Sequence, residues 1–123
     1  MKTILLVEDH DANRIVLRRR LERRGYAVVE AANGAEAVER FAETAPACVI
    51  MDLSMPVMSG IEATEIIRRT PAGRQTTILA LTAHAMAAMR EKCVETGFTA
   101  FLTKPINFEA LVASVEHLSG PAT

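Results

Sequence analysis

Five short apolar segments alternate with stretches of helical period along the 123 residues of the chain. The segments that we predict to be strands are 3–7, 27–31, 48–51, 78–81 and 99–103. The first, third and fourth are apolar at nearly every position, which is typical of interior parallel strands covered by helices on both faces. The fifth differs, because Thr99, Phe101 and Thr103 occupy alternate positions, and this pattern favours an edge strand with one partly exposed face.

Residues suited to cap helices mark the segments between these strands. Asn33 with Glu36 three residues later resembles a capping box, and Ser59 and Asn107 are suited to begin later helices. The glycines suited to end helices in the left-handed conformation are Gly25 and Gly97. Strands that alternate with helices through right-handed crossovers predict an α/β fold, a (βα)5 three-layer sandwich around a five-stranded parallel sheet.

Length and composition fit one domain with its own core and exclude several classes of protein. Hydrophobic residues make up 50% of the chain, and the formal net charge of −1 gives no overall basic excess for nucleic acid. No apolar run approaches the length of a membrane span, and the N-terminus lacks the shape of a signal peptide. Cys48 falls in a strand and Cys93 in a predicted helix, so we interpret both as buried, reduced thiols of a cytoplasmic protein.

Polar residues follow four of the predicted strands at the point where each strand ends. Glu8 and Asp9 follow the first strand, Asp52 the third, Thr82 the fourth and Lys104 the fifth. The carboxyl ends of parallel strands meet at one edge of an open sheet, where binding sites are built. We therefore expect these five side chains to converge.

Three carboxylates at one sheet edge favour a cation site. At an effective dielectric near 20, two carboxylates about 4 Å apart repel by roughly 4 kcal/mol, so a raised pKa or a bound cation is expected. Glu8, Asp9 and Asp52 suit Mg²⁺, which binds through few carboxylates and keeps several waters. For the neighbouring Asp11 we favour a solvated or helix-capping role.

Asp52 is the candidate nucleophile. Ser59 is the better cap for the following helix, which leaves Asp52 available to attack a phosphoryl group and form an acyl phosphate. Lys104 and Thr82 are suited to neutralise and hydrogen-bond the phosphoryl oxygens. Taken singly, Thr82 would be interpreted as a loop hydroxyl and Lys104 as a surface lysine, and their shared position at strand ends favours the site.

In these residues the chain resembles the receiver domain of two-component response regulators, over essentially its whole length. The motifs that carry the resemblance are Leu6-Val7-Glu8-Asp9, Met51-Asp52-Leu53-Ser54-Met55-Pro56 with Gly60, Leu81-Thr82-Ala83, and Lys104-Pro105. The resemblance implies the strand order 2-1-3-4-5 of the CheY-like, flavodoxin-like fold. It also implies a phosphoacceptor signalling switch rather than an enzyme, one that promotes only its own phosphorylation and dephosphorylation.

The resemblance assigns a role to each site residue. Asp52 would accept phosphate from a phosphohistidine, and Mg²⁺ would be held by Glu8, Asp9, Asp52 and the backbone carbonyl of Ser54. Thr82 and Lys104 would contact the phosphoryl oxygens. The residue that would follow Lys104 through a cis peptide bond is Pro105, and cis is a minority state even before proline.

The family couples phosphate to a face made by the fourth helix, fifth strand and fifth helix. Thr82 and Phe101 occupy its switch positions, although an aromatic residue at position 101 is also a common core residue. Ser54 and His84 should border the path of the water that hydrolyses the acyl phosphate, so we hypothesise that both influence its lifetime. For His84 an exposed histidine at a helix start is the equally supported alternative.

A sensor histidine kinase or a histidine phosphotransfer protein is the expected partner, with an unidentified downstream protein at the output face and with no nucleic acid or membrane. The first helix carries six arginines that we hypothesise help to dock the phosphodonor, although a charged stripe is usually a solvated face. These arginines are Arg14, Arg18, Arg19, Arg20, Arg23 and Arg24.

Other classes of protein fit the strand-end loops less well. A flavin or nucleotide binder would need a glycine- or hydroxyl-rich loop where this chain has Glu8-Asp9-His10-Asp11. A hydrolase of the haloacid dehalogenase type would need a second aspartate where Ser54 stands. A pseudo-receiver that binds partners without phosphorylation is the remaining alternative, but every residue that the chemistry needs is present.

The extent of the domain is predicted as residues 1–123, with a flexible tail at 119–123 and no output domain. Met1 leads at once into the first strand, which favours a stand-alone regulator. The segment 81–86 also resembles receivers attached to hybrid histidine kinases, so an excised domain is the alternative.

Overall fold

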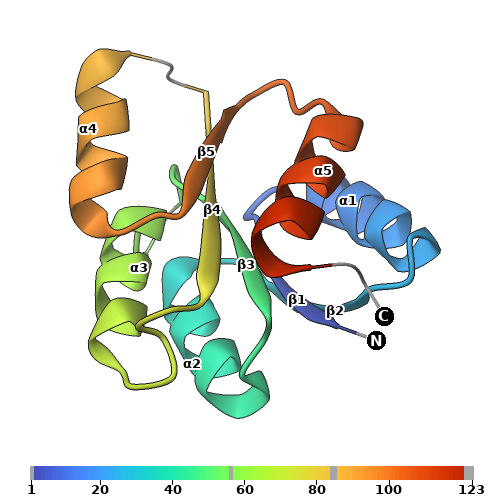
Figure 1. Cartoon of the computed structure of the whole chain (residues 1–123), viewed down its shortest axis with the longest axis horizontal. Helices are drawn as coiled ribbons and strands as arrows, with labels where there is room; N and C mark the ends of the chain where they lie inside the picture. The colour runs from blue at the N-terminus through green and yellow to red at the C-terminus, as the bar shows by residue number, and fades with distance from the viewer. Residues whose placement is uncertain (1, 56, 84–85, 121–123) are drawn as a thin grey trace.

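The computed structural model describes residues 2–55, 57–83 and 86–120, and Figure 1 shows a sheet with helices on both sides. Within these ranges the strands are β1 (Thr3–Val7), β2 (Ala27–Ala31), β3 (Cys48–Asp52), β4 (Thr77–Thr82) and β5 (Ala100–Thr103). The helices are α1 (Asp11–Arg23), α2 (Gly34–Thr44), α3 (Gly60–Arg69), α4 (Ala87–Thr96) and α5 (Phe108–Ser119). Strand and helix alternate, as the sequence pattern predicts.

The sheet is parallel and has the order β2-β1-β3-β4-β5, which confirms the predicted 2-1-3-4-5 topology. In this order β1 lies between β2 and β3, and Val7 pairs in register with Met51. The residues that follow these two strand positions, Glu8 and Asp52, are therefore brought to the same point of the sheet edge.

Two apolar layers hold the helices on the sheet. On one face Leu6, Ile50 and Leu79 pack with residues of α1 and α5, and on the other Leu5 and Val49 pack with residues of α2 and α3. Figure 1 shows α1 and α5 on one side of the strands and α2 and α3 on the other. The interior strands are buried on both faces, as their continuous apolar sequences predict. Among the described residues, no helix has the length and hydrophobicity needed to cross a bilayer.

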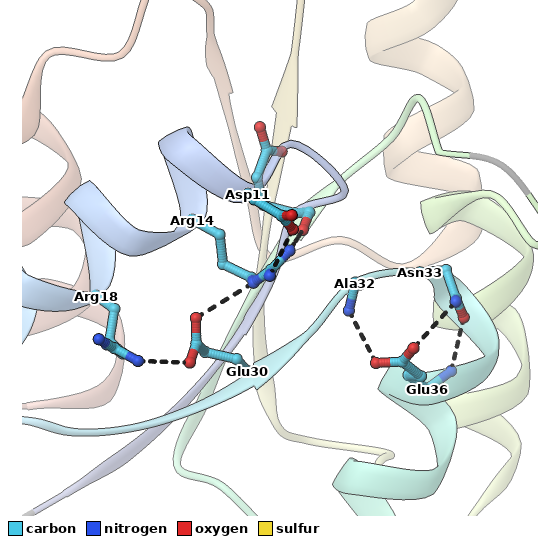
Figure 2. A network of polar contacts seen from close by, with 8 residues as sticks. Asp11, Arg14, Arg18, Glu30, Ala32, Asn33 and Glu36 are labelled. Atoms are coloured by element: carbon cyan, nitrogen blue, oxygen red, sulfur yellow. Dashed lines mark hydrogen bonds and ion pairs between the residues drawn. The ribbon is translucent and has the colours of Figure 1, made fainter.

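The predicted helix caps are confirmed. The side-chain oxygen of Asn33 accepts from the backbone N–H of Glu36 at 2.9 Å, as the close view in Figure 2 shows. Ser59 and Asn107 cap α3 and α5 in the same way. The predicted glycine positions both have positive φ, 95° for Gly25 and 103° for Gly97.

The predicted bounds of three strands differ from the structure by one residue at an end, and so does the start of the predicted tail. β3 runs one residue further, to Asp52, and β4 one residue further at each end, from Thr77 to Thr82. Thr99 lies before β5 rather than within it, because its hydroxyl accepts from the N–H of Ile78 at 2.9 Å and takes the place of a ladder bond. Ser119, predicted as the start of a flexible tail, is the last residue of α5, and its hydroxyl donates to the carbonyl of Val115 at 2.7 Å. Residues 121–123 lie outside the described part of the chain.

One loop residue has a strained backbone. Val57, in the loop between β3 and α3, has φ of 70°, a left-handed conformation that β-branched residues rarely adopt. Its side chain is 84% exposed, so little packing offsets the strain. We expect Val57→Asn to raise the free energy of unfolding by about 1 kcal/mol, since asparagine tolerates this conformation.

Urea denaturation would measure this gain. Val94→Asn is the matched control, because Val94 is an exposed valine in the regular helix α4 and the two residue types have similar helix propensities. Equal effects of the two substitutions would contradict the assignment of strain to Val57.

Candidate functional site

The structure brings the acidic residues and the lysine together at the carboxyl end of the sheet. Ligand oxygens of Glu8, Asp9 and Asp52 all lie within 4.8 Å of one another. The ammonium of Lys104 lies 3.2 Å from Oδ2 of Asp52 and 3.5 Å from Oε2 of Glu8. Glu8 and Asp52 are buried, whereas Asp9 is exposed, so the site opens to solvent on the Asp9 side.

Thr82 ends β4 beside this cluster and is buried. Its carbonyl accepts from the backbone N–H of Lys104 at 2.7 Å, which ties the end of β4 to the segment after β5. The Lys104–Pro105 peptide bond is cis, as the resemblance implies. The backbone thus holds the end of β4 beside the segment that carries Lys104 into the site.

The loop after β3 fixes Asp52. The backbone N–H of Ser54 donates to Oδ1 of Asp52 at 3.1 Å. Gly60 begins α3 directly behind it, and a Cβ atom at position 60 would lie only 2.2 Å from the carbonyl oxygen of Asp52. Glycine is therefore needed there for the helix to start so close to the strand end.

Burial and the neighbouring charges move the pKa values of Glu8 and Asp52 in opposite directions. Burial raises the pKa of Glu8 to about 7, with Asp52 adding to the rise and Lys104 opposing it. Burial also acts to raise the pKa of Asp52, but hydrogen bonds from Glu8 and Ser54 and the charge of Lys104 outweigh it and place that pKa below its ordinary value. Of these two carboxyls, Asp52 is therefore the first to ionise.

This arrangement predicts an unusual pH dependence of stability in Mg²⁺-free solution. Glu8 has an ordinary pKa of 4.5 and a folded-state pKa of about 7. The stability that protonated Glu8 gives to the folded state is therefore fully present below pH 4.5 and is lost as the pH rises through about 7. We expect the thermal midpoint to fall between about pH 5 and pH 7.5, as followed by circular dichroism. The Glu8→Gln variant should lack this fall, and an identical fall in the variant would contradict the assignment.

The donor set fits Mg²⁺. Three carboxylates supply hard oxygen ligands, the exposed position of Asp9 leaves room for bound water, and Lys104 alone offsets only part of the negative charge. Among the described residues these carboxylates form a group whose oxygens are close enough to share one ion. The residues that would hold it are Glu8, Asp9 and Asp52, and a role for the carbonyl of Ser54 stays a prediction.

The other predicted residues lie farther from the carboxylates or outside the described chain. Phe101 is on the edge strand β5, half-buried, and packs against the cluster that includes Cys93. The guanidinium of Arg90 on α4 lies 5.2 Å from the centre of the Phe101 ring. Asp11 is exposed and pairs with Arg14 rather than capping α1, which fits the solvated alternative. His84 lies outside the described residues.

Two contacts with Glu8 were not predicted from the sequence, one made by Asn13 and one by Arg14. The amide of Asn13 donates to Oε1 of Glu8 at 3.3 Å, and Arg14 donates to the Glu8 carbonyl at 2.8 Å. The short loop between β1 and α1 was the available signal, because it puts the first turn of the helix within reach of the acidic pair.

The arginines of the first helix do not form one free basic face. Arg14 and Arg18 pair with Glu30 of β2, and Arg24 pairs with Glu109 of α5. Arg20 stacks on the ring of Phe108, 4.2 Å from its centre. Arg14 and Arg18 thus bind within the protein, and a docking role for some of the first-helix arginines stays a prediction.

A groove of about 380 Å³ adjoins the carboxylates. It runs between α1 and the segment after β5, and Figure 1 shows α1 and α5 side by side there. Its lining residues are Glu8, Asn13, Val16, Leu17, Arg20, Leu81, Lys104, Pro105 and Ile106. Val16 is 54% exposed, so the groove presents apolar surface beside Glu8 and Lys104.

Comparisons with known proteins agree with this geometry. The family described as "Response regulator receiver domain" matches residues 4–116. The signal transduction histidine-protein kinase BarA of Shigella flexneri is 39% identical over 109 residues, which cover 89% of this chain but 12% of BarA. The polar-differentiation response regulator DivK of Brucella anthropi is 30% identical over 98% of both chains.

A solved structure adds a comparison at the site. The receiver domain of sensor histidine kinase PA1611 from Pseudomonas aeruginosa has a TM-score of 0.90 and 35% identity, covering 97% of this chain and 98% of that one. That structure is described as having a magnesium ion coordinated in its active site cleft. The similarity in sequence and in fold extends over the part of the chain that carries the acidic cluster.

Proposed function

Because the chain belongs to the response regulator receiver family, we propose that it is a phosphoacceptor switch in which Asp52 takes a phosphoryl group from a phosphohistidine. The observation that carries this proposal is the cluster of Glu8, Asp9, Asp52 and Lys104 at one sheet edge. Receiver domains work with histidine kinases and downstream proteins, and they are not enzymes that turn over a separate substrate.

The proposed transfer forms a bond between an oxygen of Asp52 and phosphorus and breaks the bond between phosphorus and the imidazole nitrogen of the donor. The imidazole leaves with its electron pair and takes up a proton from solvent. Lys104 would neutralise one phosphoryl oxygen, and the hydroxyl of Thr82 would donate to another. Bound Mg²⁺ would supply further charge neutralisation, held by Glu8, Asp9, Asp52 and the Ser54 carbonyl. The same residues would promote hydrolysis of the acyl phosphate.

The proposed output is a change in the face made by α4, β5 and α5. Thr82 and Phe101 would couple the phosphoryl group to this face, and Ser54 and His84 would set the lifetime of the phosphorylated state. The proposal covers residues 1–123 as one receiver domain and includes a cytoplasmic location. The free, buried thiols of Cys48 and Cys93 support a reducing compartment.

Incubation with Mg²⁺ and acetyl phosphate tests the proposal against the pseudo-receiver alternative. We expect the intact mass to rise by one phosphoryl group per chain, and EDTA should prevent the rise. A protein that stays unmodified with acetyl phosphate, phosphoramidate and a phosphorylated histidine phosphotransfer domain would favour the pseudo-receiver.

The groove beside α1 is the proposed docking site for the phosphodonor. A donor must bring its histidine to Asp52. The apolar groove with Val16 and Ile106 is also lined by Lys104, whose ammonium lies 3.2 Å from the Asp52 carboxylate. We expect Val16→Asp to slow phosphotransfer from a histidine phosphotransfer protein by about tenfold or more, since it places a charge in an apolar contact. Uptake from acetyl phosphate should be unchanged.

Val94→Asp is the matched control for this docking prediction, because Val94 is also an exposed valine of a helix, α4, and does not line the groove. Stopped-flow or quench-flow phosphotransfer assays would compare the two variants. Equal rates for the wild type and Val16→Asp would show that the donor docks elsewhere.

A further inference from the structure

The peptide unit that joins Glu8 to Asp9 is held from the side of the first helix. Its carbonyl oxygen, which belongs to Glu8, accepts from Nη1 of Arg14 at 2.8 Å. On the other side of Glu8, the backbone N–H donates to the carbonyl of Ala31 on β2 at 3.1 Å. A peptide unit is planar, so holding its oxygen limits the movement of the two Cα atoms from which the side chains of Glu8 and Asp9 extend.

Arg14 is itself held by carboxylates. Its Nη2 donates to Asp11 at 2.7 Å and its Nε to Oε1 of Glu30 at 3.2 Å, and Figure 2 shows the guanidinium between these two residues. The side chains of Arg14 and Glu30 are 15% and 29% exposed, so this pair is partly buried. Asp11 is 80% exposed, and its pair with Arg14 is a surface pair. A planar guanidinium with donors on three sides is oriented by such partners, whereas an ammonium would not be.

Glu30 reaches Arg14 from the edge of the sheet. It pairs in register with Leu6, two residues before Glu8, and Figure 2 shows its side chain directed at Arg14 and Arg18 of α1. Its second oxygen accepts from Nη1 of Arg18 at 2.8 Å. Both oxygens of the Glu30 carboxylate thus accept hydrogen bonds. Through Arg14, this connects β2 and α1 to the Glu8 carbonyl.

We infer that Arg14 and Glu30 are positioning residues for the acidic pair, with Glu30 orienting Arg14 and Arg14 holding the Glu8–Asp9 peptide in the geometry that binds the cation. Neither side chain touches the carboxylates of Glu8 or Asp9 in the contacts described above. The inference rests on the proposed Mg²⁺ site. It assigns a role in cation binding to a residue on the edge strand β2, outside the strand-end motifs.

A double-mutant cycle tests the inference with Mg²⁺ alone as the probe. We expect Arg14→Gln to weaken Mg²⁺ affinity by about tenfold, and Glu30→Gln by roughly threefold to tenfold, as outer-shell partners of metal ligands do. Because Glu30 acts through Arg14, the double variant should bind no more weakly than Arg14→Gln. Isothermal titration calorimetry would give the affinities, and Mg²⁺-free thermal midpoints would report stability separately.

Glu109→Gln is the matched control, since it removes another arginine–glutamate pair of α1, that with Arg24, on the side away from Glu8. Its Mg²⁺ affinity should equal that of the wild type. Variants that lose thermal stability but keep wild-type affinity would overturn the inference, and so would additive effects in the cycle.

Failure of the proposed function gives a different pattern. If the wild type itself binds no Mg²⁺, the proposed function is contradicted, and the inference is then decided by the backbone amide NMR signal of Asp9 in metal-free protein. That signal should shift in Arg14→Gln and Glu30→Gln and stay in place in Glu109→Gln. An Asp9 signal that is unchanged in all three variants would overturn the positioning role.

Discussion

Asp52→Asn should abolish Mg²⁺-dependent phosphoryl uptake from acetyl phosphate while the protein stays folded. The amide has nearly the same shape as the carboxylate but lacks the nucleophilic oxygen that would form the acyl phosphate. Asparagine can still accept from the backbone N–H of Ser54, so we expect the Mg²⁺-free variant to keep a cooperative thermal transition. Intact mass and circular dichroism would measure the two results.

The matched control for Asp52→Asn is Glu62→Gln. Glu62 is an exposed carboxyl in the first turn of α3, the helix that follows Asp52, and it lies outside the acidic cluster. The Glu62→Gln variant should take up one phosphoryl group per chain, as the wild type does. Uptake by Asp52→Asn at the wild-type level would place the acceptor on another residue.

Lys104→Met should slow phosphoryl uptake by about 10²- to 10³-fold at saturating Mg²⁺, which is the usual effect of removing one donor that stabilises transition-state charge. The ammonium lies 3.2 Å from Asp52 and 3.5 Å from Glu8, so it is already positioned where phosphoryl charge would develop. Methionine keeps the length of the side chain and removes the charge. The rate of mass increase with acetyl phosphate would measure the effect.

Lys104→Arg should restore little of this rate, because a planar guanidinium does not replace a compact ammonium in a site of this size. Lys92→Met removes an exposed lysine of α4 and serves as the control. A rate for Lys104→Met within about twofold of the wild type would contradict a role for this lysine in transfer.

The elements governed by local sequence were predictable. Segment 48–51 is apolar at every position and so has no polar side chains for a solvated face. The structure buries it between two helical layers. Asn33, Ser59 and Asn107 cap their helices because a short side chain bonds to a backbone N–H three residues on. Convergence of the strand-end residues followed from the parallel sheet, since every strand presents its carboxyl end at one edge.

Features that depend on contacts between distant segments were not predictable. A stripe of arginines has the same sequence whether it is solvated or paired, and the pairing of Arg14 with Glu30 depends on β2 lying beside β1. The hydroxyl of Thr99 replaces a ladder bond to Ile78, which no strand propensity indicates. The positive φ of Val57 was likewise not predictable, because valine itself disfavours that conformation.

Chemical trapping of the phosphorylated residue tests the central claim most directly. The chain would be incubated with Mg²⁺ and acetyl phosphate and then reduced with borohydride, which converts an aspartyl phosphate to homoserine, before peptide mass analysis. The account predicts homoserine at position 52 and unmodified Glu8 and Asp9. Conversion at position 8 or 9, or recovery of intact Asp52 from protein that carries a phosphoryl group, would contradict it.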